Sequence, residues 1–385
     1  MINVLIAPNA FKHSLTATDA AVAIREGLLQ SSMDYSCECF PVGDGGDGTG
    51  QLIMDKCGGI RYSVEVSDPL GRQIKAGFGL INNGEAALIE MADASGLRLL
   101  GIHELNPLRA TSYGTGQLIK ASLDKGVRKI ILCMGGSATV DGGCGILQAL
   151  GVRFLDADKK ELLDLPERLT DLVHIDVSGL DQRITDCELT ILCDVDNRLL
   201  GPKGAAAIFG PQKGASQHDV QKLEAALACF RKVVLEQTGR DMAGIAYGGT
   251  AGGAAAGLYA LLGARLVNGI DYFLELTAFS QSLEKADLVL TGEGSIDEQT
   301  LQGKAPFGVA VKAKAHGVPV IGLAGKVPMF PQEVMHQYFD ALFSICNGPL
   351  DLPTAMSATC FNLVRTAKDI GHLLALKCPS VVQRR

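Results

Sequence analysis

The stretch INVLIAPNAFKHSLTATDAAVAIREGLL, residues 2–29, contains the pattern on which the prediction of the fold rests. Residues 3–7 are a short β-rich run, and Thr16 opens a segment whose apolar residues recur at helical spacing. These apolar residues are Ala17, Ala20, Ala21, Ile24 and Leu28. The stretch therefore predicts a strand, a loop that carries Lys12 and Ser14, and a helix.

The same order of elements returns near the end of the chain. A strand at 287–291 is followed by a glycine-rich loop, a helix at about 305–315 and a second strand at 318–325. Strand, helix and strand in this order predict a right-handed parallel crossover. A final helix is indicated by an apolar stripe, which consists of Met356, Cys360, Leu363, Ala367, Ile370 and Leu374. We therefore expect both ends of the chain to belong to one parallel sheet.

The middle of the chain is less regular and predicts an inserted domain. Candidate strands there are residues 61–66, 76–81, 86–90, 129–133 and 189–193. A chain of 385 residues exceeds the size at which one core keeps growing, so two domains are the default. The predicted fold class is α/β: residues 1–60 and 281–385 form a doubly wound parallel sheet of the Rossmann or flavodoxin type, and residues 61–280 form a large mixed α/β insert. The active-site cleft is expected between these domains.

Composition and charge exclude several classes of protein. The formal charge of −7 and the pI near 5.6 come without any Lys- or Arg-rich run, which argues against a nucleic-acid partner. The longest apolar segment, residues 251–264, is too short and too rich in Ala and Gly to span a bilayer. The 11 cysteines include no C-x-x-C pair, and the first residues do not resemble a signal sequence, so we expect buried thiols in a reducing cytoplasm.

The loop GDGGDG at 43–48 follows a predicted strand at 38–42 and precedes a helix, so it is expected to form a second βα turn. Its spacing matches G-x-G-x-x-G, which would suggest a dinucleotide pyrophosphate on a helix N-terminus. Asp44 and Asp47 argue against that interpretation, because two carboxylates repel a pyrophosphate unless a cation lies between them. Carboxylates suit Mg²⁺, although an aspartate in such a loop can also merely cap a helix. The chemically suitable candidates are Asp44, Asp47, Asp194 and Asp297.

A second glycine loop, GGSATVDGG at 135–143, lies between the strand KIILCM and the helical stretch ILQAL. Backbone N–H groups at the start of a helix and the hydroxyls of the loop can gather on one anion. The loop therefore predicts a phosphate-binding site, to which Gly135, Gly136, Ser137, Thr139 and Asp141 contribute. The alternative is a tight turn that packs a helix on a sheet, and the loop taken alone does not decide between the two.

Two further loops combine glycine with polar side chains: TSYGTG at 111–116, which contains Thr115, and TGEGS at 291–295, which contains Glu293. Neither GxxxxGK[ST] nor the Gly-rich, HRD and DFG set of protein kinases occurs, so a kinase would belong to neither of those classes. Lys12 is the preferred cation for a small anionic substrate, because it follows the first strand, at whose carboxyl end open α/β folds bind ligands. The other candidate cations are Arg72, Arg198 and Lys304.

Eight motifs in this order resemble the type I glycerate kinase family over residues 1–373. They are APNAFKHSL (7–15), DGGDGT (44–49), DPLGR (68–72), TSYGTG (111–116), GGSATVDGG (135–143), CDVDN (193–197), FGPQKGA (209–215) and TGEGSID (291–297). The resemblance implies ATP-dependent phosphorylation of D-glycerate, commonly at the 2-hydroxyl, by a two-domain α/β protein. The sequence departs from the family at Arg198, where proline is usual, and at Asn9-Ala10-Phe11, where many members have Asp-Ser-Tyr.

On this basis we expect ATP and Mg²⁺ as cofactors and glycerate as substrate. The loop 135–143 is expected to hold nucleotide phosphates, and Asp44 and Asp47 to bind the metal. The expected catalytic residues are Lys12, which neutralises anionic charge, and Asp194 or Asp297, which accepts the proton of the hydroxyl. Further candidates for substrate or phosphate binding are Ser14, Thr115, Glu293 and Lys304.

Three alternatives stay open at this point. A kinase of the same kind could form 3-phosphoglycerate, an NAD-dependent oxidoreductase could act on a hydroxy acid, and a binding module could hold glycerate or nucleotide without turnover. The residues do not decide which hydroxyl of glycerate accepts the phosphate, and a homo-oligomer is compatible with the sequence.

Overall fold

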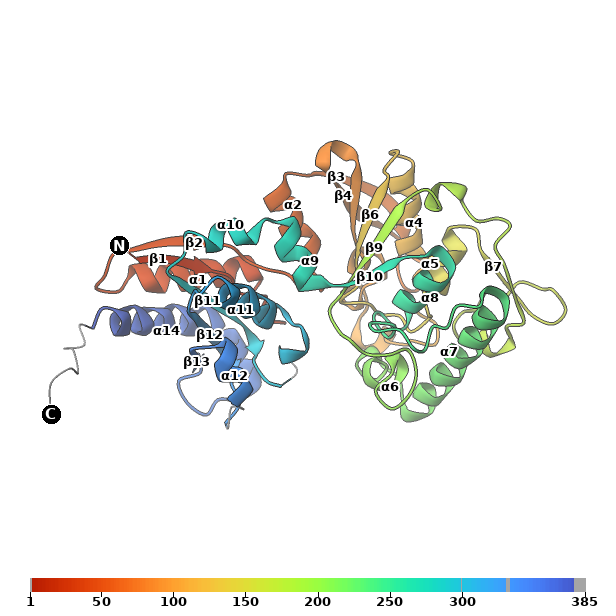
Figure 1. The fold of residues 1–385 in the computed structure, drawn as a ribbon. Coiled ribbons are helices and arrows are strands. Elements are labelled where there is room, and N and C mark those ends of the chain that lie inside the picture. Colours follow the sequence, from red (N-terminus) through yellow and green to blue (C-terminus); the bar gives the residue numbers. More distant parts are fainter. Residues whose placement is uncertain (1, 299, 330–332, 377–385) are drawn as a thin grey trace. The chain divides into compact units, whose positions relative to one another are not determined.

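The computed structural model describes residues 2–298, 300–329 and 333–376, and it divides the chain into two compact units (Figure 1). Unit 1 consists of residues 1–43 and 273–385, and unit 2 consists of residues 44–272. The sequence predicts the boundaries near 60 and 280, so residues 44–60 and 273–280 lie in the other unit from the one expected. Residues 377–385, which the sequence assigns to the first domain, lie outside the described residues.

Unit 1 is built on a five-stranded parallel sheet. Its strands are β1 (Ile2–Ile6), β2 (Tyr35–Cys39), β11 (Leu288–Ser295), β12 (Val320–Lys326) and β13 (Ala341–Ser344). They lie in the order β13-β12-β11-β1-β2, and all neighbours are parallel. Within the unit this is the order 2-1-3-4-5 of flavodoxin-like folds, in which the direction of winding changes between β1 and β11. The predicted doubly wound sheet made from both ends of the chain is therefore confirmed.

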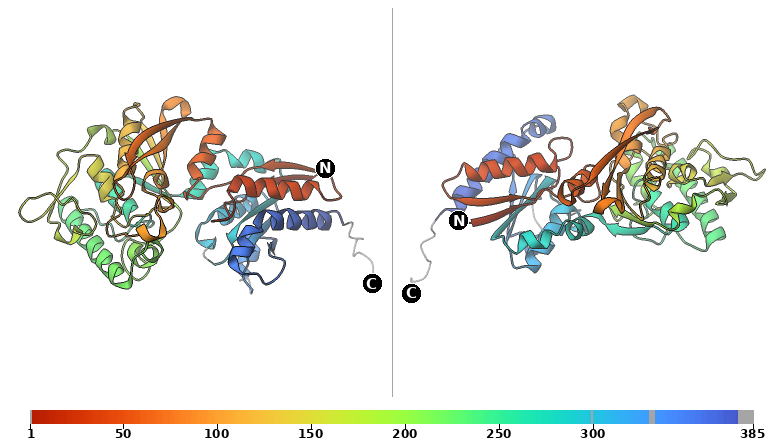
Figure 2. Two further views of the ribbon diagram at one scale, coloured as in Figure 1. Left: turned by 180° about the vertical axis from the view of Figure 1, so that it is seen from behind. Right: turned by 90° about the horizontal axis from the view of Figure 1, so that it is seen from above.

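Helices cover this sheet in the way that right-handed crossovers require. The crossovers β1–α1–β2 and β11–α11–β12 run in opposite directions along the sheet, which puts α1 (Ala17–Leu29) and α11 (Ala305–Ala315) on opposite faces. Helix α14 (Thr359–Leu374) lies beside α1 (Figure 2). The two approach so closely at Gly27 that a Cβ there would lie 2.2 Å from the carbonyl oxygen of Val364. The remaining helices are α10 (Phe279–Leu283), α12 (Glu333–Tyr338) and α13 (Leu352–Ser357).

Unit 2 contains a six-stranded mixed sheet, which agrees with the mixed α/β insert that the sequence predicts. Its order is β10 (Arg265–Asn268), β9 (Glu188–Cys193), β6 (Lys129–Cys133), β5 (Ala86–Glu90), β4 (Gln73–Ile81) and β3 (Ile60–Ser67). The first four are parallel to one another, and β4 and β3 continue the sheet as an antiparallel meander. A separate hairpin consists of β7 (Arg153–Leu155) and β8 (His174–Asp176).

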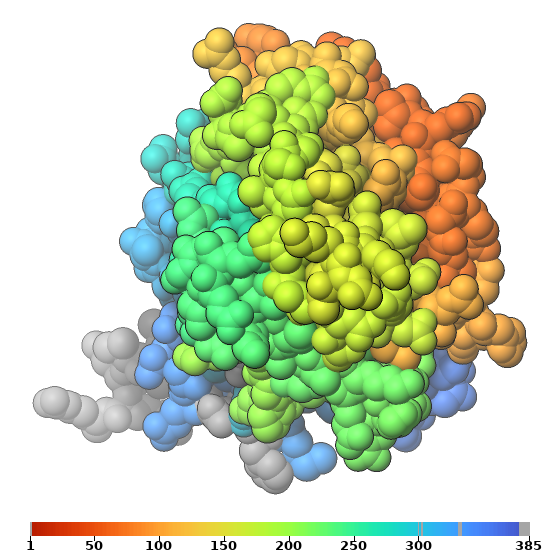
Figure 3. All heavy atoms as spheres, turned by 90° about the vertical axis from the view of Figure 1, so that its right-hand side faces the viewer, coloured from red at the N-terminus to blue at the C-terminus, as the bar shows by residue number. Residues whose placement is uncertain are grey.

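Most helices of unit 2 share one large apolar core with this sheet. They are α3 (Met91–Ser95), α4 (Tyr113–Leu123), α5 (Cys144–Ala149), α6 (Ala205–Phe209), α7 (Gln217–Thr238) and α8 (Ala254–Leu262). Helix α2 (Thr49–Cys57) packs on β4 and β5 outside this core, and α9 (Gly269–Leu276) crosses the unit boundary. The segment with β7, β8 and α7, yellow to green, forms much of the face of this unit in Figure 3. Short 3-10 helices lie at Asn82–Gly84, Leu97–Leu99, Ile102–Glu104, Leu169–Asp171, Gln182–Ile184, Pro211–Lys213 and Thr300–Gln302.

Helix α2 corrects one prediction of local structure. The strand before the loop 43–48 is β2 in unit 1, but α2 packs on β4 and β5 in unit 2. The loop therefore does not join a strand to a helix of the same sheet, and the expected βα turn is wrong. As for membranes, none of the helices within the described residues combines the length and apolarity needed to cross a bilayer.

Candidate active site

Four parallel strands of unit 2 end at the same edge of the sheet. The register places Glu90 opposite Cys133, Cys133 opposite Leu192, and Cys193 opposite Asn268. The loops that follow β5, β6, β9 and β10 consequently leave from one edge, which is where open α/β sheets bind ligands. The loop 135–143 and Asp194 are among them.

The loop 43–48, which carries Asp44 and Asp47 and is called the acidic loop below, meets the glycine loop 135–143 and Asp194 at this edge. The N–H of Gly135 donates to the carbonyl oxygen of Gly45 at 3.0 Å. A Cβ on Gly135 would lie 2.4 Å from Cα of Gly46 and 3.2 Å from Oδ2 of Asp194, so only glycine fits between the two. The structure thus brings together three segments that the sequence singles out and that lie up to 150 residues apart, from Asp44 to Asp194.

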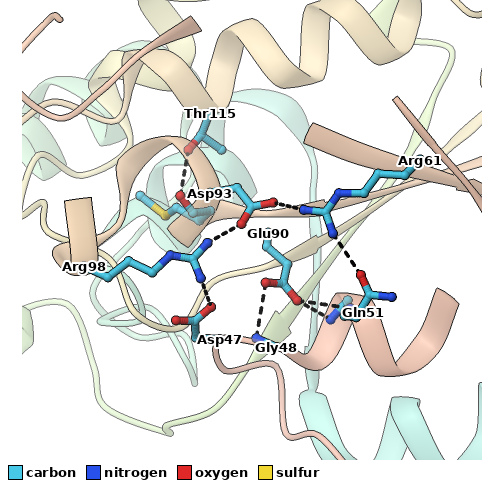
Figure 4. A network of polar contacts seen from close by, with 10 residues as sticks. Asp47, Gly48, Gln51, Arg61, Glu90, Asp93, Arg98 and Thr115 are labelled. Atoms are coloured by element: carbon cyan, nitrogen blue, oxygen red, sulfur yellow. Dashed lines mark hydrogen bonds and ion pairs between the residues drawn. The ribbon is translucent and has the colours of Figure 1, made fainter. Parts of the chain in front are cut away.

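Glu90 binds the start of helix α2 (Figure 4). Its carboxylate accepts hydrogen bonds from the N–H groups of Gly48 at 3.2 Å, Gly50 at 2.5 Å and Gln51 at 3.3 Å. Burial, followed by repulsion from Asp93, raises the pKa of Glu90 above its ordinary value. In the dinucleotide interpretation a pyrophosphate would need these same N–H groups. The carboxylate that already holds them, and the absence of a βα unit here, argue against an NAD site.

An ion-pair network adjoins this helix start (Figure 4). Arg98 binds Oδ1 of Asp47 at 2.9 Å and also pairs with Asp93, which accepts from Arg61 at 3.0 Å. The side chain of Asp47 is 41% exposed, so its pair with Arg98 contributes only about 0–1 kcal/mol to stability, and Asp47 can exchange this partner for a cation. Arg61, Asp93 and Arg98 were not among the residues that the sequence indicates, because a charged residue without a glycine loop carries no local signal.

Asp141 organises the glycine loop from within. It is completely buried and accepts from the N–H and hydroxyl of Ser112, at 2.9 and 2.6 Å, and from the N–H groups of Gly143 and Gly145, at 3.0 and 3.2 Å. The N–H groups at the start of α5, which the sequence expects to be open to an anion, are therefore bound by the protein itself. This corrects the expectation that these N–H groups are open to an anion, and it shows that Asp141 positions the loop; phosphate binding by the loop stays a prediction.

Two predicted hydroxyl ligands also have protein partners. Thr115 is completely buried within α4, where its Oγ1 lies 2.7 Å from Oγ of Ser95. The hydroxyl of Ser14 donates to the carbonyl oxygen of Met356 at 2.5 Å. A hydroxyl that donates to a carbonyl has no second proton to give to a phosphate. These contacts hold both hydroxyls in the protein, and a role of Ser14 and Thr115 in binding stays a prediction.

Lys213 is a further residue at this site that the sequence does not indicate. It ends the 3-10 helix Pro211–Lys213, is 3% exposed, and donates from Nζ to Oγ of Ser137 at 2.9 Å and to the carbonyl oxygen of Thr139 at 2.7 Å. Burial lowers the pKa of Lys213 to about 8, against the opposing influence of Asp141 and Asp194. The motif FGPQKGA contained the signal, but a lysine in a turn is normally exposed, and only the fold shows that this one is not.

The loop 248–253 (GGTAGG) supports the same region. The N–H of Gly142 donates to the carbonyl oxygen of Gly252 at 3.1 Å, and a Cβ on Gly252 would lie 2.1 Å from the carbonyl oxygen of Thr139. The N–H of Gly249 donates to the carbonyl oxygen of Asn197 at 2.8 Å. This loop therefore joins 135–143 to the segment after Asp194, a role that local glycine content alone does not reveal.

Unit 1 carries the candidates Lys12, Glu293, Asp297 and Lys304, near the change of winding between β1 and β11. The N–H of Asn9 donates to the carbonyl oxygen of Gly292 at 2.8 Å, which fixes the loop that bears the exposed Lys12 beside the end of β11. Glu293 is 7% exposed and accepts from the hydroxyl of Thr300 at 2.8 Å, and the same hydroxyl accepts from the N–H of Asp297 at 3.1 Å. Lys304 is the N-terminal cap residue of α11.

The fit of Mg²⁺ to the predicted ligands depends on how many protein groups the ion needs. Within the described residues no three His, Cys, Asp or Glu side chains gather as a metal-binding group. Mg²⁺ commonly keeps waters and binds through one or two carboxylates and the phosphates of a substrate. Asp44, which is 8% exposed, and the half-exposed Asp47 satisfy this smaller requirement.

Fold and site together define an α/β protein of two units, with acidic, glycine-rich and hydroxyl-rich loops at the carboxyl ends of parallel strands. Comparison with known proteins identifies the family. The sequence model described as "Glycerate kinase family" matches residues 4–375. A glycerate kinase from Halalkalibacterium halodurans is 43% identical over 371 residues, which cover 96% of this chain and 98% of that protein. A glycerate 2-kinase from Escherichia coli is 39% identical over 376 residues, with 97% and 98% covered.

A solved structure agrees with these relatives. The crystal structure of a Salmonella typhimurium LT2 protein that is assigned as a glycerate kinase 2 superimposes with a TM-score of 0.80 at 40% identity, over 97% of this chain and 98% of the other. This chain belongs to the glycerate kinase family. Its enzyme class is accordingly that of the kinases, and the resemblance that the eight motifs suggest is confirmed.

Proposed function

We propose that this protein transfers the γ-phosphoryl group of ATP to the 2-hydroxyl of D-glycerate and forms 2-phosphoglycerate and ADP. The observation that carries the kinase activity is the family match over residues 4–375. The choice of the 2-hydroxyl is supported by the E. coli relative, which is named a glycerate 2-kinase. The scattered cysteines favour a reducing compartment, so the cytoplasm is the proposed location.

The residues of unit 2 divide into a cation-binding and an anion-binding part. Asp44 and Asp47 are proposed to hold Mg²⁺, which when bound supplies positive charge to the polyphosphate. Ser137 and Thr139 are proposed to hold phosphate oxygens, with Gly135 and Gly136 allowing close approach of the backbone. Phosphoryl transfer requires mainly alignment and charge neutralisation, which these groups provide.

A carboxylate completes the proposed reaction as base. The 2-hydroxyl oxygen forms a bond to the γ-phosphorus, its proton passes to Asp194 or Asp297, and the bond from the γ-phosphorus to the bridging oxygen breaks as ADP leaves. Asp194 is half-buried beside Gly135, and Asp297 lies on the loop after β11. Lys12 is proposed to neutralise anionic charge, and Glu293 and Lys304 to support the loops that contact substrate.

The product identifies the reaction directly. We expect that incubation of the protein with D-glycerate, ATP and MgCl₂ yields a 2-phosphoglycerate signal in ³¹P NMR, with none when glycerate or the protein is omitted. A 3-phosphoglycerate signal would preserve the kinase and refute the proposed regiochemistry. Consumption of ATP only with another hydroxy acid would refute the substrate, and the lack of any turnover would favour a binding module.

A further inference from the structure

The glycine loop 135–143 rests on a buried positive charge. Both hydrogen bonds of Lys213 Nζ go to uncharged oxygens, those of Ser137 and Thr139. In the part of the chain that the structure describes, Lys213 forms no ion pair, and the carboxylates that act on it are Asp141 and Asp194. A buried charge is costly unless an opposite charge compensates it. Asp141 compensates it only in part, because its oxygens already accept four hydrogen bonds from Ser112, Gly143 and Gly145.

The hydroxyl of Thr139 is a second, independent sign that this loop binds a ligand. Thr139 is completely buried, and its Oγ1 has no hydrogen-bond partner. Buried hydroxyls are nearly always paired, so an exception at a suspected site needs an explanation. The carbonyl oxygen of Thr139 accepts a hydrogen bond from Lys213, so the buried ammonium contacts the same residue that carries the unpaired hydroxyl.

A purely structural role explains these observations less well. A neutral amide or hydroxyl could tie Ser137 and Thr139 together without bringing a charge into the interior, and it would leave the hydroxyl of Thr139 unexplained. An anion at the loop accounts for both observations, because it accepts a hydrogen bond from the hydroxyl of Thr139 and compensates the charge of the Lys213 ammonium. The N–H groups at the start of α5 cannot take this part, since Asp141 holds them.

We infer that Lys213 is a positioning residue for polyphosphate: it fixes Ser137 and Thr139 in the conformation that receives a phosphate, and it supplies the positive charge that the loop otherwise lacks. The inference rests on the proposed function and extends it, because it assigns the nucleotide phosphates, and not the carboxylate of glycerate, to this loop. The motif FGPQKGA thereby acquires a role in the reaction.

The inference predicts a specific dependence on pH. The protonated form of Lys213 binds an anion more tightly than the neutral form, and burial lowers the pKa of the ammonium to about 8 although Asp141 and Asp194 oppose the shift. The affinity for polyphosphate should therefore fall as pH rises through 8, by up to tenfold for each further pH unit. The second ionisation of a phosphate ester has a pKa near 6, so the charge of MgADP changes little above pH 7.5 and does not interfere.

The test uses inorganic tripolyphosphate and MgADP as probes, titrated calorimetrically into the full-length protein. For the variant K213M we expect an affinity for both probes about ten- to a hundredfold weaker, with a glycerate KM within about threefold of the wild type. Lys203 is an exposed lysine ten residues earlier, so K203M removes the same charge and should bind both probes like the wild type. The affinity of the wild type for MgADP should fall between pH 7.5 and 9.5, whereas that of K213M for MgADP should stay flat.

Each outcome of these titrations supports or refutes the inferred role of Lys213. If the affinity of the wild type for MgADP is flat over this pH range, the inference fails even if K213M does not fold. It fails equally if K213M binds tripolyphosphate normally or loses only affinity for glycerate. Turnover of D-glycerate by the wild type tests the proposed function separately. A protein that binds tripolyphosphate through Lys213 but does not phosphorylate glycerate would retain the anion site and refute the kinase.

Discussion

The loops 43–48 and 135–143 look alike in sequence and are built alike in one respect. In each, a carboxylate of the protein binds the N–H groups at the start of the next helix: Glu90 binds those of α2, and Asp141 binds those of α5. The two loops differ in the charged side chains that are left to bind a ligand. The first loop presents Asp44 and Asp47, whereas the second is backed by Lys213.

This difference shows that glycine spacing does not identify the ligand of such a loop. Glycine permits a close approach of the backbone, but the N–H groups that make a helix start attractive to anions are used in both loops. On the proposals made above, the sign of the remaining charge selects the ligand: a cation for the loop 43–48 and an anion for the loop 135–143. A kinase requires both, because Mg²⁺ and polyphosphate bind together.

Replacing the catalytic base should produce the largest effect. Asp194 lies where the two loops meet, beside Gly135, and Asp297 lies in unit 1. For the aspartate that accepts the proton, we expect substitution by Asn to lower kcat by about 10² to 10⁴ with little change in nucleotide affinity. Steady-state kinetics of D194N and D297N measure this side by side.

The pair of variants serves as its own control, because both remove one carboxylate of the same kind. A large loss in D194N alone would place the base at the junction of the loops, and a large loss in D297N alone would place it after β11. A loss below about tenfold in either variant rejects that residue as base.

The second prediction concerns the buried carboxylate of the loop 135–143. D141A removes the acceptor of four hydrogen bonds and leaves the donors of Ser112, Gly143 and Gly145 unpaired in the interior. We expect the free energy of unfolding to fall by about 3 kcal/mol or more. Urea denaturation followed by circular dichroism measures it. The control D158A, at a side chain that is 79% exposed, should change stability by less than about 0.5 kcal/mol; an equal loss in both variants would contradict the positioning role.

Separating the two loops should have a smaller effect on stability than on activity. In G135A the new Cβ would lie 2.4 Å from Cα of Gly46, so the loops must move apart. A displacement near 1 Å can cost about 10² in rate, and we expect a loss of this order in kcat/KM. A Cβ added at Gly244 would meet no atom within 4 Å, and its φ is not positive, so G244A is the matched control. Normal kinetics of G135A would show that contact between the loops is not required.

Much of the fold could be predicted because its signals are local. Apolar periodicity marked the strands and helices at both ends of the chain, and the alternation of strand and helix predicts a parallel sheet without any tertiary information. The candidate loops could be recognised for the same reason, since glycine and aspartate cluster within a few consecutive residues at 43–48 and 135–143.

The contacts that define the site could not be predicted because they join distant residues. Glu90 reaches Gly48 across 42 positions, and Ser112 reaches Asp141 across 29, so no window of sequence reveals that the helix starts are already bound. The burial of Lys213 depends on contacts with Ser137 and Thr139, 76 and 74 positions away. The sequence predicts helix α2 in the wrong domain because adjacency along the chain does not show where it passes from one unit to the next.

The smallest predicted effect concerns Glu90, the carboxylate that binds the start of α2. Burial and the nearby Asp93 raise the pKa of Glu90 above its ordinary value, so the folded state favours the neutral form more than the unfolded state does. The stability of the wild type relative to E90Q should therefore be greatest below the ordinary pKa near 4.5 and should fall as pH rises through the raised pKa. The fall amounts to about 1.4 kcal/mol for each pH unit that separates the raised pKa from the ordinary one. Urea denaturation of both proteins between pH 4 and 8 measures this difference.

Glu104 provides a control of opposite sign on the same unit. Its carboxylate accepts from the N–H of Gly101 and pairs with Arg72, and these contacts lower the pKa of Glu104. The wild type should consequently gain stability relative to E104Q as pH rises, while it loses stability relative to E90Q. If the stability differences from E90Q and from E104Q change with pH in the same direction, Glu90 holds α2 as an ordinary exposed cap does. The contrast between the start of α2, held by a costly buried charge, and the start of α5, held by a fully hydrogen-bonded Asp141, would then be lost.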